Sequence, residues 1–230
     1  MGEFDIANLA SHLVMYLVVL LLAISCHEAG HAWMSYKFGD DTAYMLGRVT
    51  LNPVAHTDPV GTLLIPIISF VVTFTSGVRV PLIGWGIPTP VNPRKWDNYK
   101  LANVMVSIAG IIANIILATI GFVIFKTLIE TDTITAQNAD EGLFRVAIIF
   151  LNYLIFLNVS LAVFNLLPFP PLDGSKVLAT FLPASFQPMF DMLESYGFLI
   201  LILLMYLGVI GLIMYPFYVF VEWLLFTRWF

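Results

Sequence analysis

The feature that most constrains the fold of this chain is an apolar run over residues 9–26, which contains no Lys, Arg, Asp or Glu. The run leads directly into the sequence His27-Glu28-Ala-Gly-His31. In a membrane-inserted helix a charged side chain costs roughly 2.5 to 3.5 kcal/mol, so ionisable groups placed there need a specific role. On a helix, His27 and His31 lie one turn apart on one face, where both imidazoles can bind one metal ion. Glu28 then lies where a carboxylate can take a proton from a metal-bound water.

A role without metal is the alternative interpretation of this motif. In a helix bundle, two histidines and a carboxylate can satisfy one another's hydrogen-bonding groups. The single cysteine, Cys26, stands beside the motif, but its side chain points about 100° away around the helix from that of His27. We interpret Cys26 as a packing residue.

The composition is that of a polytopic membrane protein. Of the 230 residues, 60% are hydrophobic and 11% are charged, whereas about 25% are charged in a typical soluble domain. No polar stretch is long enough for a separate soluble module, so residues 1–230 are expected to form a single integral membrane domain. The net charge of -5 and the lack of a dense basic patch argue against a nucleic-acid partner. The acidic residues Glu3 and Asp5 indicate that the first apolar segment is not a cleavable signal peptide.

Hydropathy and segment length predict an all-α polytopic membrane protein with about four transmembrane helices. We expect these spans over residues 9–36, 101–125, 143–167 and 197–221. Residues 61–75 are apolar but only 15 long and are interrupted by Pro66, which predicts a re-entrant or interfacial segment.

The connecting segments carry their own signals. Residues 44–51 contain β-type side chains and predict a short membrane-associated β element. Residues 76–98 are rich in Gly and Pro and predict an ordered, non-helical loop, and residues 183–195 predict a polar or interfacial link.

The distribution of basic residues predicts the orientation. Six of the ten Lys and Arg residues lie between the first span and the 101–125 span, and Lys176 lies in the connection between the 143–167 and 197–221 spans. Basic loops face the cytoplasm, so these seven residues are expected inside and the other three outside. The ends of the first and the 143–167 spans then share one side, so His27, His31 and Asp173 lie at similar depth. This holds only if residues 61–75 do not cross the membrane.

Asp173 is the best candidate for a third metal ligand. A catalytic zinc ion usually has three protein ligands and one water. His12 lies fifteen residues before His27, about 22 Å along a helix, and cannot share the site. Asp173 stands in a Pro-Pro-Leu-Asp-Gly turn at the end of a span, and irregular backbone at membrane depth is tolerated where it lines a cavity. The alternative is that Asp173 caps a helix that begins near Ser175.

Taken together, these motifs resemble the site-2 protease family of intramembrane zinc metalloproteases, in particular its short prokaryotic branch. The resemblance covers roughly residues 9–185, with the 197–221 span following. It rests on these segments: 27–31 (His-Glu-Ala-Gly-His), 107–114 (Ser-Ile-Ala-Gly-Ile-Ile-Ala-Asn), 165–174 (Asn-Leu-Leu-Pro-Phe-Pro-Pro-Leu-Asp-Gly), 47–53, 56–61 and 84–93.

The resemblance implies a set of site residues. His27, His31 and Asp173 would bind one zinc ion per chain, and Glu28 would act as the general base and later as the proton donor to the leaving amine. Asn165 would contact the substrate backbone or the developing oxyanion.

Two further positions have alternative interpretations. Asn114 is either a substrate contact or an interhelical hydrogen-bonding residue, in a segment that departs from the family where Ile111 replaces the usual proline. His56 is either a transition-state hydrogen-bond donor or, with Asp58, a residue that pins its loop.

The function implied by the resemblance is an intramembrane zinc endopeptidase that hydrolyses peptide bonds within or next to transmembrane segments of membrane protein substrates. The resemblance places it in the lipid bilayer of a prokaryotic cell (inner) membrane with the active site towards the cytoplasm, and it specifies no oligomeric state. The 44–51 strand would pair with an extended substrate. The alternative is a metal-binding membrane transporter or a non-proteolytic partner protein of the same fold, and Glu28 separates the two because a hydrolase needs this carboxylate off the metal.

Overall fold

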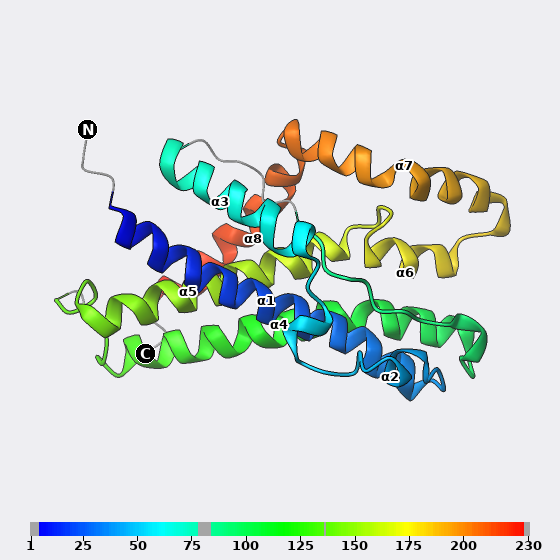
Figure 1. Cartoon of the computed structure of the whole chain (residues 1–230), viewed down its shortest axis with the longest axis horizontal. Coiled ribbons are helices and arrows are strands. Elements are labelled where there is room, and N and C mark those ends of the chain that lie inside the picture. Colours follow the sequence, from blue (N-terminus) through cyan, green and yellow to red (C-terminus); the bar gives the residue numbers. More distant parts are fainter. Residues whose placement is uncertain (1–4, 78–83, 136, 228–230) are drawn as a thin grey trace.

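The computed structural model describes residues 5–77, 84–135 and 137–227, and it contains helices but no strand within these residues. Figure 1 shows the arrangement. The longer elements are α1 (Ile6–Lys37), α3 (Ile65–Ser76), α4 (Tyr99–Glu130), α5 (Gly142–Leu166), α6 (Asp173–Phe181), α7 (Gln187–Tyr206) and α8 (Val209–Phe226). The short ones are α2 (Thr42–Met45), the π-helical turn η2 (Pro59–Leu64) and the 3-10 turns η1 (Pro53–Ala55), η3 (Pro93–Lys95) and η4 (Ala184–Phe186).

The core is formed by α1, α4 and α5, which lie side by side, with the end of α8 packed against them. Val19 of α1, Phe125 of α4, Ile155 of α5 and Leu225 of α8 are buried together. Many large apolar side chains on the outside are exposed, as expected for helices that face lipid rather than water. The all-α polytopic prediction is therefore confirmed.

Helices α1 and α4 approach closely at small residues. A Cβ atom added to Gly30 would lie 2.9 Å from the backbone oxygen of Ala109, closer than real Cβ contacts. Small residues at helix crossings let backbones approach in membranes, where burial of apolar surface gives little driving force between helices. The crossing brings α4 against the face of α1 that carries His27 and His31.

The prediction of four spans is not supported, because six helical segments within the described residues are long and apolar enough to cross a membrane. One of the additional segments is the continuous helix Pro59–Ser76, formed by η2 and α3. We expected Pro66 to interrupt this segment, but Pro66 lies in the first turn of α3. Within the continuous helix this position comes just after the π-helical turn η2, and such local π adjustments let a membrane helix accommodate the backbone groups that proline leaves unpaired.

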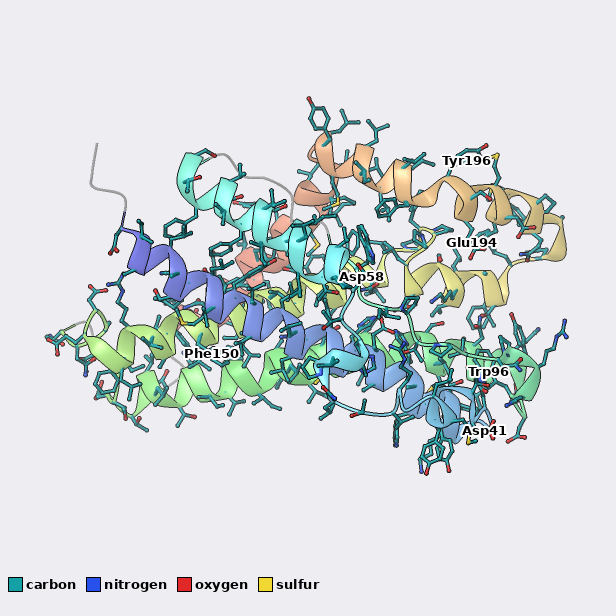
Figure 2. All side chains as sticks on the ribbon, viewed as in Figure 1. Asp41, Asp58, Trp96, Phe150, Glu194 and Tyr196 are labelled. Atoms are coloured by element: carbon teal, nitrogen blue, oxygen red, sulfur yellow. The ribbon has the colours of Figure 1, made fainter. Side chains whose placement is uncertain are left out.

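The chain nevertheless returns to the start of this helix. The backbone N–H of Trp85 donates to the oxygen of Gly61 at 3.2 Å, and that of Asn92 donates to Asp40 Oδ2 at 2.7 Å. Residues 84–92 therefore lie beside the beginning of the α3 segment and the end of α1. Figure 2 shows Asp41 and Trp96 near the end of α1, and Asp58, at the start of η2, nearer the middle of the molecule. Residues 84–92 form no helix or strand, as predicted for the 76–98 loop, whose residues 78–83 lie outside the described part and whose residues 93–95 form η3.

The predicted β element over residues 44–51 is wrong. Residues Thr42–Met45 form the helical turn α2, and Gly47 ends it with a φ of +68°. The N–H of Arg48 donates to the oxygen of Ala43 at 2.8 Å, which closes the turn. A helix end of this kind, with glycine in the left-handed conformation, satisfies backbone groups locally. The strand preference of the side chains does not prevail, because the segment has no partner strand to pair with.

The predicted single span over residues 197–221 is also wrong, because α7 and α8 are separate helices. The break falls at Gly208, which has a φ of +76° and stands directly before α8. A left-handed residue cannot continue a right-handed helix, and glycine adopts this conformation without steric cost. The predicted link over residues 183–195 is helical from Gln187 onward.

Candidate metal centre and active site

Three potential metal ligands converge where α1, α4 and the start of α6 meet. Nε2 of His27 and Nε2 of His31 lie 3.0 Å apart, and Oδ2 of Asp173 lies 3.2 Å from the first and 3.1 Å from the second. All three side chains are buried. The prediction that the two motifs, far apart in sequence, lie at the same depth is confirmed.

Asp173 reaches the histidines because the chain turns sharply between α5 and α6. It is the first residue of α6, and its carboxylate faces the histidines instead of capping that helix. A Cβ atom on the next residue, Gly174, would lie 2.2 Å from the backbone oxygen of Leu166, so only glycine permits this close return towards α5.

The charge of Asp173 is supported by a neighbouring cation. Lys176, one turn later on α6, places Nζ 2.9 Å from Oδ1, the oxygen that the histidines do not contact. Asp173 is therefore an anionic ligand donor whose free oxygen is held by a cation.

The other ring nitrogen of each histidine is occupied, which determines the tautomers. Nδ1 of His31 lies 2.7 Å from the oxygen of Val106, which can only accept, so Nδ1 carries the proton. Nδ1 of His27 lies 2.7 Å from Oδ1 of Asn114. The amide nitrogen of Asn114 donates to the oxygen of Ala23 and to Oδ1 of Asn158, so its Oδ1 is the acceptor for His27.

These tautomers leave both Nε2 lone pairs pointing towards the same carboxylate oxygen. Three acceptors this close repel one another unless a cation lies among them. Two neutral imidazoles and one carboxylate, each oriented by an outer hydrogen bond, are a donor set that suits zinc and leaves a fourth position for water. The residues present therefore fit a catalytic zinc ion.

Gly110 of α4 provides the space for the two imidazoles. A Cβ atom there would lie 2.5 Å from Nε2 of His31 and 2.7 Å from Cε1 of His27. Any side chain at this position would displace the rings, so the backbone of α4 forms one wall of the centre.

Glu28 lies next to the centre but is not among the converging ligands. Its Oε2 accepts a hydrogen bond from the backbone N–H of Thr89 and lies the same 2.8 Å from the Thr89 hydroxyl. Thr89 belongs to the non-helical segment 84–92, which passes over α1 at this point. The carboxylate is thus held by the loop and is separate from the three-ligand group.

Helix α7 contacts two segments that border the centre. A Cβ atom on Gly197 would lie 2.3 Å from the oxygen of Pro170, in the turn that leads to Asp173. Next to it, the ring of Phe198 packs edge-on against Trp85 at 5.6 Å between centroids. The Asp173 turn and the 84–92 segment are therefore covered by consecutive residues of one helix.

The remaining predicted site residues lie around this centre without contacting its ligands, except Asn114. Asn165 donates to the oxygen of Leu161 in its own helix at 3.0 Å. His56 is fully buried, and its Nε2 lies 2.9 Å from the oxygen of Thr50. Oδ1 of Asp58 accepts from the N–H groups at the start of η2.

Sequence reasoning did not identify Thr89, Asn158, Gly110 or Lys176. The sequence could have indicated Asn158, because an amide side chain within the apolar α5 segment needs a hydrogen-bond partner in the membrane. Thr89 stands between two prolines in a loop, and nothing in that pattern indicates a contact with a residue 61 positions earlier.

Comparison with known proteins also indicates a zinc metalloprotease. The model of Peptidase family M50 matches residues 15–208. A Bacillus subtilis protein named “Putative zinc metalloprotease YwhC” is 40% identical over 193 residues, which are 84% of this chain and 80% of that protein. A Mycolicibacterium smegmatis protein named “Putative zinc metalloprotease Rip2” is 29% identical over 198 residues, 85% of this chain and 69% of that protein. No solved structure gives a significant match.

Proposed function

The chain belongs to peptidase family M50, the site-2 protease family of zinc metalloproteases, and we propose that it is an intramembrane endopeptidase. The six apolar helices found among the described residues make it an integral membrane protein. Its reaction is hydrolysis of a peptide bond within or next to a transmembrane segment of a membrane protein substrate. Residues 1–230 act as one domain, with His27, His31 and Asp173 as the zinc ligands.

The observation that carries this proposal is the separation of Glu28 from the three ligands. A transport site can use every nearby carboxylate for the ion, whereas a hydrolase needs one carboxylate that stays off the metal to accept a proton from water. The structure contains the three-ligand group, and beside it a carboxylate that is held by other groups.

Each residue then has a defined part. Zinc held by His27, His31 and Asp173 would supply a Lewis acid that polarises the peptide carbonyl and lowers the pKa of water. Glu28 accepts a proton from the attacking water and later passes it to the leaving amine. Asn165, in the last turn of α5, offers its amide oxygen or nitrogen to the substrate backbone or the oxyanion.

Asn114 orients His27, since its amide groups are already bonded to partners on α1 and α5. His56 is part of the packing of the 84–92 segment, because its backbone oxygen accepts the N–H of Ile87 at 2.8 Å. Neither residue is proposed to touch the substrate.

The active site faces the cytoplasm of a prokaryotic cell (inner) membrane in this proposal. The support is the basic end of the molecule, where Lys37, Lys95 and Lys100 lie near the end of α1 and the start of α4. Single cysteines at Asp97 and Asp140, in a Cys26→Ser background, test it. A membrane-impermeant maleimide should label only position 140 in intact spheroplasts, and labelling of position 97 instead would reverse the orientation.

The function is tested with detergent-purified protein that is loaded with zinc, desalted and assayed for bound metal. We expect one zinc per chain in wild type and Glu28→Gln, and lost or much weakened binding in His31→Ala and Asp173→Asn. Matched controls are His12→Ala on the same helix and Asp40→Asn, a buried carboxylate outside the centre, and both should keep zinc.

Cleavage is measured on a quenched fluorescent peptide with an apolar segment of about 20 residues interrupted by Gly-Pro, in mixed micelles. Wild type should cleave it, and Glu28→Gln should be slower by about 10²- to 10⁴-fold, the usual contribution of a general base. Folded wild type without zinc, or full activity of Glu28→Gln, would overturn the proposal. Zinc uptake into vesicles that changes in Glu28→Gln would indicate a transporter instead.

A further inference from the structure

The structure assigns a positioning role to Thr89: we infer that its backbone N–H and hydroxyl hold the Glu28 carboxylate off the metal and in the orientation needed to accept a proton. This inference rests on the proposed function, since Glu28 is the general base only in a hydrolase. It names a residue that lies far from the metal-binding motifs in sequence.

The first support is the geometry of the contact. The Thr89 N–H and the Thr89 hydroxyl both lie 2.8 Å from Oε2 of Glu28, and the hydroxyl is also 2.9 Å from the backbone oxygen of Glu28. Oε1 accepts no hydrogen bond from the part of the chain that the structure describes. One carboxylate oxygen is therefore held by charge-assisted hydrogen bonds, and the other is available to water.

The second support is the rigidity of the segment around Thr89. Pro88 and Pro90 flank it, so the N–H of Thr89 is the only backbone donor in these three residues, and both proline φ angles are restricted. A donor in a preorganised segment restrains the carboxylate without ordering a flexible loop at the moment of reaction.

The third support is the anchoring of the segment on both sides of Thr89. The N–H of Ile87 donates to the oxygen of His56, and the N–H of Asn92 donates to Asp40. Gly86 packs directly on α1: a Cβ atom there would lie 2.7 Å from Cγ2 of Ile24, one turn before Glu28. The segment is therefore pressed against the same stretch of α1 that presents the carboxylate.

If Thr89 only anchored the 84–92 segment, its loss would have the same effect as the loss of another anchor of that segment. Thr62 is such an anchor and provides the matched control. The Thr62 hydroxyl donates to the oxygen of Trp85 at 2.7 Å, so it anchors the same segment without touching Glu28. Thr62→Val removes a loop anchor, whereas Thr89→Val removes both a loop anchor and a donor to the carboxylate.

The test uses full-length protein loaded with Co²⁺ in place of zinc and read by its visible d–d absorption, which reports the ligand arrangement. In Thr89→Val we expect a shifted spectrum, because the Glu28 carboxylate is then held by the backbone N–H alone and can move towards the ion. Thr89→Ser should restore the wild-type spectrum, and Thr62→Val should leave it unchanged. When Glu28 is replaced by Gln in both wild type and Thr89→Val, the spectra of the two resulting proteins should no longer differ.

Peptide cleavage gives a second readout. Thr89→Val should lower kcat by about tenfold or more with little change in KM, a part of the 10²- to 10⁴-fold supplied by a general base. A wild-type spectrum and kcat for Thr89→Val, or the same changes in Thr62→Val, would overturn the inference. If wild type binds Co²⁺ but cleaves no peptide, the proposed function fails while the spectra still test the Thr89–Glu28 contact.

Discussion

The backbone of Gly110 lies against the ring of His31, so that a single added Cβ atom would approach Nε2 to 2.5 Å. The contact joins α4 to the metal-binding face of α1 at the point where a ligand nitrogen faces the centre. A position that sequence alone marks as a small residue of a membrane helix thus shapes the metal site directly.

Gly110→Ala should therefore disturb zinc binding more than folding. The methyl group would push one or both imidazoles away from Asp173, and we expect zinc affinity to fall by at least about 100-fold, the upper range for changes around a metal site. Gly121→Ala on the same helix is the control, because its Cβ would meet side-chain atoms of Leu154 and Ile155 at 3.1 Å and no metal ligand. Equal zinc affinity in the two variants would refute this role of Gly110.

Asn158→Leu should weaken zinc binding although Asn158 touches no ligand. Its Oδ1 accepts from Asn114, and without this acceptor the Asn114 amide loses the orientation that holds His27. Outer hydrogen-bond partners of metal ligands are typically worth 10- to 100-fold in affinity, and we expect a loss of about that size in a competition titration.

The control for this prediction is Asn152→Leu. Asn152 lies on the same helix, and among the described residues its amide donates to the oxygen of Ile148 one turn earlier. The expectation is unchanged zinc affinity in this variant. A comparable loss in both would mean that amide removal from α5 acts through packing and not through His27.

Lys176→Met should lower zinc affinity by a smaller factor. Lys176 pairs with the Asp173 oxygen that faces away from the histidines, and its loss frees that oxygen to rotate towards the ion. Because more than half of the Lys176 side chain is exposed, solvent weakens the pair, and we expect only a few-fold change. Lys95→Met, which removes the surface pair with Asp41, should have no effect on zinc, and an equal loss there would point to net charge as the cause.

Asp40 should make the stability of the protein dependent on pH. Burial acts to raise the pKa of Asp40, but hydrogen bonds from Asn92, Thr42 and Ser35 outweigh it and lower the pKa below its ordinary value. The folded state then binds fewer protons than the unfolded chain. This contribution to stability is full above about pH 4, the ordinary pKa of an aspartate, and is lost as the pH falls through the folded value.

The measurement is thermal unfolding of wild type and Asp40→Asn in detergent between pH 3 and pH 7. Wild type should unfold at the higher temperature near neutral pH, and the gap should narrow below about pH 4. Asp41→Asn, at an exposed neighbouring position, should show no such gap. A constant gap across the range would exclude the carboxylate of Asp40 as its source.

The sequence by itself determined the features that depend on local periodicity and on composition. The spacing of His27 and His31 places both on one helical face, because an α-helix repeats every 3.6 residues. Asp173 could be assigned to the same site because the distribution of basic residues puts the ends of the first and the 143–167 spans on one side of the membrane. The all-α membrane class followed from the scarcity of charge.

The tertiary structure alone decided the features that depend on which segments meet. Gly208 breaks the last apolar segment, and Pro66 does not break the α3 segment, because the cost of either residue depends on its position in a helix. The contact of Thr89 with Glu28 joins residues 61 positions apart through a loop without periodicity. Sequence patterns describe the faces of single elements, whereas hydrogen bonds between elements exist only once the chain has packed.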